Sequence, residues 1–449
     1  MNSSMTARSA STHVRYGIVA TLFLVSAFSY GDRVVLSIAG IAFTHDLHLT
    51  PVKLAYILSG FSWTYAAAQL PSGWLLDRFG TKRVYGISIL LWSILAALVG
   101  FAGYLTGAVA FATIFGLRLL SGLAQSPVFP GNGRVVAAWF PSTERGTASA
   151  IFNSSQYFAL VLFAPLMGWV AHALGWKECF WLLGVLGLLL FLLWQKEIFD
   201  VKDHPRINDA EIATIEDGGG LCVIGSASRD SGNQITWKAV TGLFRNRMLA
   251  GIYLGQFCIN TLTWFFISWF PLYLSQARHM SIGKVGIAAA LPALCGSVGG
   301  ILGGITSDGL LRAGRSLTFA RKAPIIAGMA LAMCMMLCNV VDAQWEILLL
   351  MSLAFFGKGF GALGWTVISD TSPRGMVGLN GGVFNFCGNI AGITTPLVIG
   401  YLVQRTGSYR LALIYVGVTA LMAIASFAFI VGPIRRLTPE EVGGAPAVI

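Results

Sequence analysis

Charged side chains are scarce in this sequence. Only 11% of its 449 residues are Asp, Glu, Lys or Arg, whereas 55% are hydrophobic. About a quarter of the residues of a soluble chain are charged, so the composition excludes a soluble globular protein. The apolar residues recur in long runs along nearly the whole chain, which is typical of an integral membrane protein.

Acidic residues and cysteines are also few. The 30 Lys and Arg residues outnumber the 19 Asp and Glu residues, but they lie in short loops between apolar runs and form no single patch. We therefore expect no nucleic-acid partner and interpret the basic loops as a topology signal. The seven cysteines fall mostly within apolar runs and show no Cys/His ligand spacing. We expect no structural disulfide, no metal and no other cofactor.

Twelve apolar stretches of about 20 residues predict an all-α membrane protein with twelve transmembrane helices. The predicted helices cover residues 16–43, 53–76, 84–104, 107–131, 146–171, 178–196, 248–274, 285–307, 323–341, 346–370, 378–404 and 409–433.

The distribution of basic residues predicts the orientation of the chain in the membrane. The loops on one side hold more Lys and Arg, such as Arg83, Arg145 and Arg321, than the loops on the other. The positive-inside rule then places both termini of a multi-pass membrane protein in the cytoplasm. The first apolar run is too long for a signal-peptide core, so we expect an uncleaved start.

One long polar segment divides the chain into two halves. We expect an N-terminal six-helix half over residues 1–195, a cytoplasmic central loop over 196–247 and a C-terminal six-helix half over 248–449. Within the loop, "NDAEIATIE" predicts a short capped surface helix, and "SRDSGNQ" predicts a flexible stretch.

The two halves also resemble each other. "GWLLDRFGTKR" (73–83) ends the second predicted helix and "GGITSDGLLRAGRS" (303–316) ends the eighth, which places Asp77 opposite Asp308. A duplicated unit of six helices is typical of secondary transporters whose substrate site lies near the membrane midplane, between the halves.

Asp32 and Arg33 are the only charged residues between Tyr16 and Phe43, and they lie about 24 Å into the first helix at 1.5 Å per residue. Ions at this depth are costly and normally mark a transport pathway. Arg33 shares a helix face with Tyr30, which suits a hydroxylated anion, and Asp32 can exchange a proton. The alternative is that the two ions form a structural pair.

Two further cations lie deep in predicted helices. Arg118 shares a face with Gln125 and is a candidate for the coupling machinery, or for a structural tie to backbone carbonyls or to Asp32. Lys358 lies in the middle of the tenth helix, out of snorkelling reach of water. A second cation in the other half suggests a substrate with two anionic ends; the alternative is a Lys paired with a structural carboxylate.

Several strings resemble a known family. "GWLLDRFGTKR" resembles the loop motif of the major facilitator superfamily, and "YGDR" with "RLLSGLAQSPVFPGNGRVVAAWFPSTERGTASAIFNSSQYF" resembles its anion:cation symporter branch. "FFGKGFGALGWTVISDTSP", "GGVFNFCGN" and "INTLTWFFISWFPLYL" are most similar to bacterial D-glucarate/galactarate transporters. The resemblance implies two six-helix halves of the major facilitator fold.

The resemblance also implies a substrate site and a coupling site. Arg33 binds the substrate carboxylate, Asp32 is protonated, and Asp77 and Arg78 lock the cytoplasmic side. Aldarates carry two carboxylates, so Lys358 becomes the second clamp. The residues expected to contact sugar hydroxyls are Tyr30, Tyr65, Gln156, Trp365 and Asn385.

One position departs from the family pattern. Gln125 stands where the family usually has a glutamate that takes part in proton coupling. An amide hydrogen-bonds like a protonated acid but does not titrate. We therefore expect Gln125 to mimic the protonated state and to leave Asp32 as the proton carrier.

The sequence thus predicts a monomeric, proton-coupled transporter that imports sugar diacids through the lipid bilayer, and not an enzyme. A hexuronate or D-galactonate importer, or a carrier weakly coupled because of Gln125, is the alternative within transport. A multidrug exporter would have fewer fixed cations, and a membrane sensor or intramembrane enzyme would need a signalling domain or a catalytic constellation that the sequence lacks.

Overall fold

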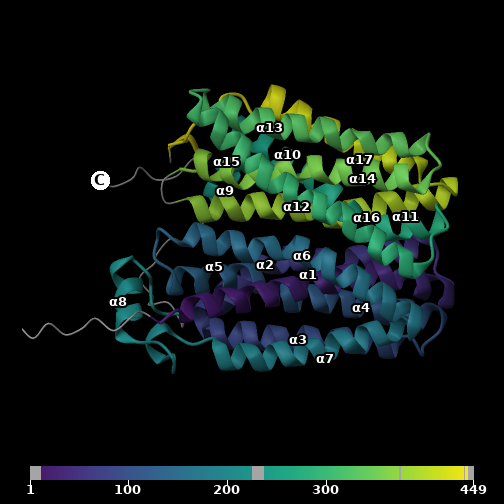
Figure 1. Cartoon of the computed structure of the whole chain (residues 1–449), viewed down its shortest axis with the longest axis horizontal. Helices are drawn as coiled ribbons and strands as arrows, with labels where there is room; N and C mark the ends of the chain where they lie inside the picture. Colours follow the sequence, from purple (N-terminus) through teal and green to yellow (C-terminus); the bar gives the residue numbers. More distant parts are fainter. Residues whose placement is uncertain (1–11, 225–236, 374–375, 439, 443–449) are drawn as a thin grey trace, which may run out of the picture.

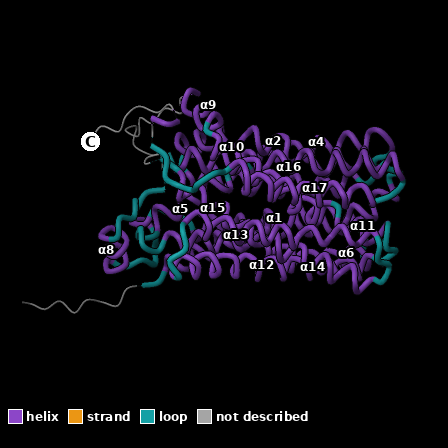
Figure 2. Tube along the Cα trace, turned by 90° about the horizontal axis from the view of Figure 1, so that it is seen from above, coloured by secondary structure: helices purple, strands orange, loops and turns teal. Residues whose placement is uncertain are grey.

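The computed structural model describes residues 12–224, 237–373, 376–438 and 440–442, and these residues form helices and loops without a strand. Two bundles lie side by side, one from the first part of the chain and one from the last (Figure 1). Their long helices run lengthwise, and loops lie at both ends of the molecule (Figure 2).

The first bundle is built from seven α-helices. They are α1 (Val14–Asp46), α2 (Pro51–Phe79), α3 (Thr81–Ala102), α4 (Gly107–Gln125), α5 (Val128–Trp139), α6 (Arg145–Ala173) and α7 (Trp176–Glu197). Pro127 separates α4 from α5, which together form one span to Trp139, eight residues beyond the predicted end.

The second bundle contains more interrupted helices. They are α10 (Arg247–Ser268), α11 (Phe270–Gln276), α12 (Ile282–Arg312), α13 (Leu317–Ala332), η2 (Met333–Asn339), α14 (Gln344–Gly359), η3 (Phe360–Ala362), α15 (Leu363–Thr371), α16 (Val377–Thr406), α17 (Arg410–Ala425) and η4 (Ser426–Ile430). The tenth predicted helix is thus broken by a 3₁₀ turn that begins two residues after Lys358.

Eleven helical segments of the described chain are long and apolar enough to cross a membrane. The twelfth span is α2, which is less apolar because it carries Ser, Thr, Tyr and Gln residues and which packs between α4 and α16. The fold therefore agrees with the predicted twelve helices.

The segment between the bundles contains η1 (Val201–Asp203), α8 (Asp209–Asp217) and α9 (Trp237–Arg245), and η5 (Glu440–Val442) lies near the C-terminus. The predicted surface helix is α8, and the Asn208 side chain caps it by accepting a hydrogen bond from the Glu211 backbone N–H at 3.0 Å. The "SRDSGNQ" stretch lies outside the described residues.

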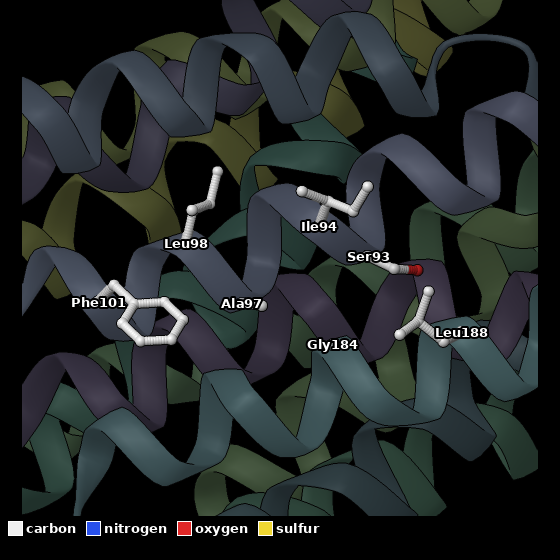
Figure 3. Close-up of a pocket in the computed structure, with 7 residues that line it drawn as sticks. All are labelled: Ser93, Ile94, Ala97, Leu98, Phe101, Gly184 and Leu188. Carbon is white, nitrogen blue, oxygen red and sulfur yellow. The ribbon is translucent and has the colours of Figure 1, made fainter.

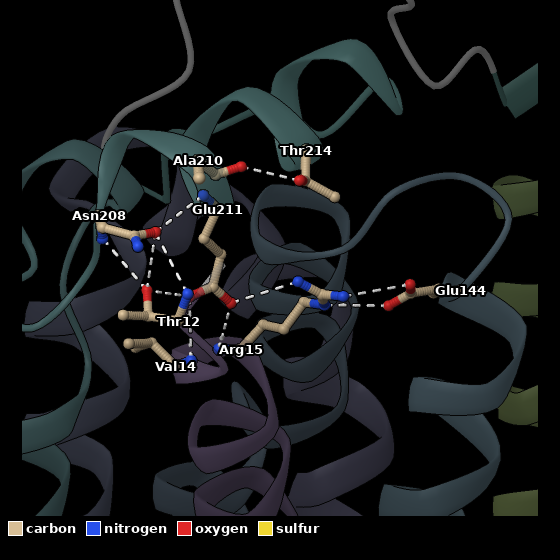
Figure 4. A network of polar contacts seen from close by, with 8 residues as sticks. All are labelled: Thr12, Val14, Arg15, Glu144, Asn208, Ala210, Glu211 and Thr214. Carbon is tan, nitrogen blue, oxygen red and sulfur yellow. Dashed lines mark hydrogen bonds and ion pairs between the residues drawn. The ribbon is translucent and has the colours of Figure 1, made fainter. Parts of the chain in front are cut away.

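A polar network fastens α8 to the first bundle (Figure 4). The Glu211 carboxylate is fully buried and accepts hydrogen bonds from the Val14 backbone N–H at 3.0 Å and the Thr12 hydroxyl at 2.7 Å. It also pairs with Arg15 at 3.3 Å, and Arg15 pairs with Glu144 at 3.1 Å. Glu211 therefore supplies acceptors for the otherwise unpaired N–H groups at the start of α1.

The two bundles meet mainly through α2 against α16 and α6 against α12. Near the 47–50 loop the Tyr56 and Tyr401 hydroxyls lie 3.2 Å apart. A Cβ built on Gly168 of α6 would lie 3.0 Å from the Cα of Gly286 on α12. Toward the α8 end, a Cβ on Gly73 of α2 would meet no atom within 4 Å. The contacts at Tyr56–Tyr401 and at Gly168–Gly286 thus lie at the end opposite α8.

Candidate functional site

Asp32 and Arg118 form a buried ion pair between α1 and α4. Arg118 Nη1 donates to Asp32 Oδ2 at 2.9 Å, and the two residues are 1% and 2% exposed, respectively. Arg33, the sequence neighbour of Asp32, takes no part in this pair. The structure therefore favours the tie between Arg118 and Asp32 over a structural pair between Asp32 and Arg33.

Gln125 completes the surroundings of Asp32. Its amide Nε2 donates to Asp32 Oδ2 at 3.0 Å, and its Oε1 accepts from the Ser29 hydroxyl at 2.8 Å. A carboxylate only accepts hydrogen bonds, so these partners fix which end of the amide faces Asp32. A protonated carboxyl at position 125 would donate to Asp32 and accept from Ser29 in the same way.

The polar contacts continue along the same two helical faces. Ser26 lies one turn from Ser29 on α1, and Asn132 lies two turns from Gln125. Asn132 Nδ2 donates to Ser26 Oγ at 2.8 Å, and Asn132 Oδ1 accepts from the Tyr85 hydroxyl at 2.9 Å. These bonds hold α1, α3 and α5 together around a buried polar seam.

Arg33 lies in a cage of aromatic rings. Its guanidinium carbon is 4.4 Å from the ring centre of Phe61, 4.8 Å from Tyr30, 5.0 Å from Tyr65 and 5.9 Å from Trp264. Arg33 is 7% exposed, its Nε has no hydrogen-bond partner, and none of the described residues supplies a carboxylate to it. The rings attract the cation but leave its donors free for an anion.

Lys358 has a similar environment on the other bundle. It lies in the last turn of α14 and is 6% exposed. Its Nζ is 5.2 Å from the ring centre of Phe355 on the same helix and 5.5 Å from that of Tyr157 on α6. Among the described residues no carboxylate pairs with Lys358, so the alternative of a structural ion pair finds no partner here.

The other predicted hydroxyl-binding residues lie on three helices. Asn385 Nδ2 of α16 donates to Gln69 Oε1 of α2 at 3.3 Å, which joins the two bundles. Trp365 is 44% exposed and stands edge-on to Phe384, with 5.0 Å between the ring centres. Gln156 of α6 donates to the Asn153 carbonyl at 3.3 Å. Tyr30 and Tyr65 meet directly at Arg33; the structure does not link Trp365 to that cage by contact.

The predicted gate residues lie near the end of α2. Asp77 pairs with Arg134 of α5, and the Arg78 guanidinium lies 5.2 Å from the ring of Trp74 and 5.6 Å from that of Phe79. All of these contacts lie within the first bundle. In the second bundle, Asp308 likewise pairs with an arginine, Arg321.

An apolar groove between α3 and α7 has a different character (Figure 3). Its volume is about 220 Å³, and Ser93 is its single polar side chain. The Ser93 hydroxyl already donates to the Ile89 carbonyl at 2.6 Å. A groove without charge, lined by exposed Ile94 and Leu98, suits lipid chains and not an anion. Within the described residues no group of three or more His, Cys, Asp or Glu side chains is placed to hold a metal ion.

Sequence reasoning did not single out Ser29, Phe61, Trp264 or Tyr157 as site residues. Ser29 lies three residues before Asp32, so helical spacing is a signal for it. Trp264 is opposite Arg33 when the halves are aligned. Phe61 and Tyr157 carry no comparable signal, because aromatic residues are ordinary in membrane helices.

Close relatives are transporters by name. The chain is 54% identical to a protein of Bacillus subtilis (strain 168) described as "Probable galactarate/D-glucarate transporter GudP", with 98% of this chain and 96% of the relative covered. It is 51% identical to a protein of Escherichia coli (strain K12) with the same description, with 96% and 97% covered. A "D-galactonate transporter" of an Escherichia coli O6:H1 strain is 38% identical over 94% of this chain and 97% of its own length.

Solved structures share the fold. The crystal structure of a D-xylose-proton symporter aligns with a TM-score of 0.72, 14% sequence identity and coverage of 96% of this chain and 99% of that chain. The sequence profile of the Major Facilitator Superfamily matches residues 22–396. With this match and relatives near 50% identity over almost its full length, the chain belongs to the Major Facilitator Superfamily.

Proposed function

We propose that this chain imports sugar diacids such as D-glucarate and galactarate together with protons. The observation that carries the proposal is the pair of buried cations, Arg33 and Lys358, one in each bundle and neither paired with a carboxylate among the described residues. A buried charge without a counter-ion is costly, so an anionic ligand stabilises both sites. The names of the relatives at 54% and 51% identity support a diacid substrate.

Each cation takes one carboxylate in this proposal. Arg33 presents a planar fork of donors that matches a carboxylate, whereas Lys358 acts as a compact point charge. The polar groups expected to contact the hydroxyls between the two carboxylates are Tyr30, Tyr65, Gln156, Trp365 and Asn385.

Asp32 carries the proton in this mechanism. Its ionised form is held by Arg118 and by the Gln125 amide. Protonation of Asp32 removes its charge and weakens the pair with Arg118, which loosens α1 from α4. A membrane-embedded carboxylate of this kind commonly serves as a proton relay.

The two halves, residues 1–195 and 248–449, rock against each other in the proposed cycle. Both termini and α8 lie on the cytoplasmic side, as the basic loops predict. The contacts between the bundles at the end opposite α8 then correspond to an inward-facing state, in which Asp77 and Arg78 do not bridge the halves. The protein acts as a monomer in the bacterial inner membrane.

The direct test is uptake of radiolabelled D-glucarate into proteoliposomes, with and without an inward proton gradient. Galactarate, D-glucuronate and D-galactonate serve as competitors. We expect accumulation above equilibrium only with the gradient, and stronger competition by galactarate than by either monoacid. Preference for a monoacid would contradict the diacid substrate, and equilibration without accumulation would contradict proton coupling.

The alternatives are an importer of a hexuronate or of D-galactonate, and a carrier that is weakly coupled because of Gln125. The observation that favours weak coupling is the Gln125 amide, which bridges Ser29 and Asp32 and does not titrate. Because a relative at 38% identity is named a D-galactonate transporter, D-galactonate is the monoacid to compare with D-glucarate.

The variant Gln125→Glu separates tight from weak coupling. It adds a second acid beside Asp32, so we expect gradient-driven accumulation of D-glucarate to rise and to depend more steeply on pH. Gln125→Met removes the hydrogen bonds without adding an acid and is the matched control. Unchanged pH dependence and accumulation in Gln125→Glu would refute a role for this position in coupling.

A further inference from the structure

The two buried cations share an arrangement that crosses the boundary between the bundles. Arg33 belongs to the first bundle, and the Trp264 ring of α10 approaches it from the second. Lys358 belongs to the second bundle, and the Tyr157 ring of α6 approaches it from the first. Each cation is therefore in contact with an aromatic ring of the opposite bundle.

The backbone around Lys358 is held in place by close helix packing. A Cβ on Gly357 would lie 2.3 Å from the Gly328 carbonyl oxygen of α13, and a Cβ on Gly359 would lie 2.4 Å from that of Gly296 on α12. Backbone atoms surround both glycines, so α14 has little freedom to rotate or slide. Lys358 stands between these two packed positions.

Tyr157 lies where α6, α12 and α14 meet. Its ring centre is 6.4 Å from that of Phe355, and its hydroxyl is 3.8 Å from the position of a Cβ on Gly300. Tyr157 thus joins α6 of the first bundle to the surroundings of Lys358.

A ring holds an ammonium group without neutralising it. The attraction is worth about 0.5–2 kcal/mol, and the cation keeps its full charge and its donors. An acidic partner would compete with the substrate carboxylate, whereas a ring does not. We propose that Tyr157 is a specificity-determining residue that holds the Lys358 ammonium where the second carboxylate of a diacid binds, an inference that rests on the proposed function.

The structural alternative is that Lys358 only balances the partial negative charge at the end of α14. Lys358 lies in the last turn of that helix, where a cation is favourable in any case. In that case Tyr157 would affect the stability of the protein but not its choice between diacids and monoacids. A comparison of matched ligands separates the two roles.

The test measures binding of D-glucarate and D-gluconate to the purified full-length protein by calorimetry. The two ligands have the same six-carbon chain and differ by one carboxylate. In Tyr157→Leu we expect the Kd for D-glucarate to rise about tenfold, as loss of a cation–π contact of about 1.4 kcal/mol predicts, with little change for D-gluconate. Tyr157→Phe keeps the ring and is expected to keep the preference for the diacid.

Two controls complete the design. Tyr104 is an exposed loop residue whose ring centre lies 3.8 Å from the Nζ of Lys177. Tyr104→Leu is expected to leave the affinities for D-glucarate and D-gluconate unchanged. In a Lys358→Met background, Tyr157→Leu is expected to have no further effect on D-glucarate binding, because the two residues act as one unit.

Three outcomes are informative. Equal losses for both ligands in Tyr157→Leu, or full additivity of the two substitutions, would overturn the role of Tyr157 while leaving the diacid function intact. Absence of D-glucarate binding to the unmodified protein would overturn the proposed function itself. If Tyr157→Leu does not fold, Tyr157→Phe and Lys358→Met still test the inference. We expect Tyr157→Phe to keep the preference for D-glucarate over D-gluconate and Lys358→Met to lose it.

Discussion

At the scale of single residues, the free donors of Arg33 are the feature with the clearest consequence. The guanidinium is surrounded by rings and has no carboxylate among the described residues, so under the proposed function a bound carboxylate supplies its missing partners. A hydrogen bond to a charged group is worth about 1.5–3 kcal/mol, which converts to roughly 10- to 150-fold in affinity.

We predict that Arg33→Ala raises the Kd for D-glucarate by that factor and that Arg33→Lys, which keeps the charge but loses the planar fork, recovers part of the loss. Binding to the purified protein is the measurement. The exposed Arg405→Ala is the control and is expected to bind normally. Affinity retained in Arg33→Ala would exclude Arg33 as a carboxylate site.

The charged residues of the site are visible in the sequence because an ion stands out in an apolar run. Asp32, Arg33, Arg118 and Lys358 were all identified in this way. The tie between Arg118 and Asp32 was one of the alternatives, but the sequence did not decide between it and a pair of Asp32 with Arg33, because the tie joins residues 86 positions apart. Tyr157 has no sequence signal at all, since only the packing of α6 on α12 brings it to Lys358.

At the scale of the elements, α8 shows how a short helix is tied to a bundle. Glu211 is buried, and its carboxylate bonds the first residues of α1 and Arg15. Removal of one partner of a buried pair costs about 3–5 kcal/mol. We predict that Glu211→Ala lowers the melting temperature of the purified protein by several degrees.

Glu216 on the same helix is the matched control for Glu211. It pairs with Lys202 at 2.7 Å, but both side chains are exposed, and exposed pairs contribute little because water and salt screen them. We expect Glu216→Ala to melt with the unmodified protein. Equal shifts in the two variants would mean that the buried network does not hold α8.

Element boundaries also show what the sequence can predict. The Asn208 cap placed α8 correctly, because capping is a local property. The break in the helix after Gly359 was not predicted, because the sequence there is a continuous apolar run that gives no sign of the 3₁₀ turn. The extension of α5 to Trp139 was missed as well, because Gly131 and Gly133 suggest an end that packing in the bundle overrides.

At the scale of the whole molecule, the two bundles approach each other closely at the end opposite α8. Gly168 and Gly286 bring α6 and α12 together there with no room for a side chain. A bulky residue at position 168 would clash with α12 and push the two bundles apart at this end. Overpacking costs about 1–3 kcal/mol, or roughly 5- to 150-fold in the population of the closed arrangement.

We predict that Gly168→Leu slows D-glucarate uptake into proteoliposomes within that range, because the proposed cycle requires this end to close. Binding in detergent is expected to change much less than uptake. Gly304→Leu on α12 is the control, since a Cβ there meets no atom within 4 Å. A normal uptake rate in Gly168→Leu would show that this contact does not limit the cycle.

The amide bridge between Ser29 and Asp32 has a consequence for how such carriers diversify. Codons for glutamine and glutamate differ by a single base, and the two side chains have nearly the same shape. Because the hydrogen bonds of Gln125 are those of a protonated carboxyl, a protonated glutamate at this position would keep the bonds to Ser29 and Asp32. Under the proposed mechanism, a single point mutation therefore converts obligate proton coupling to relaxed coupling, or the reverse.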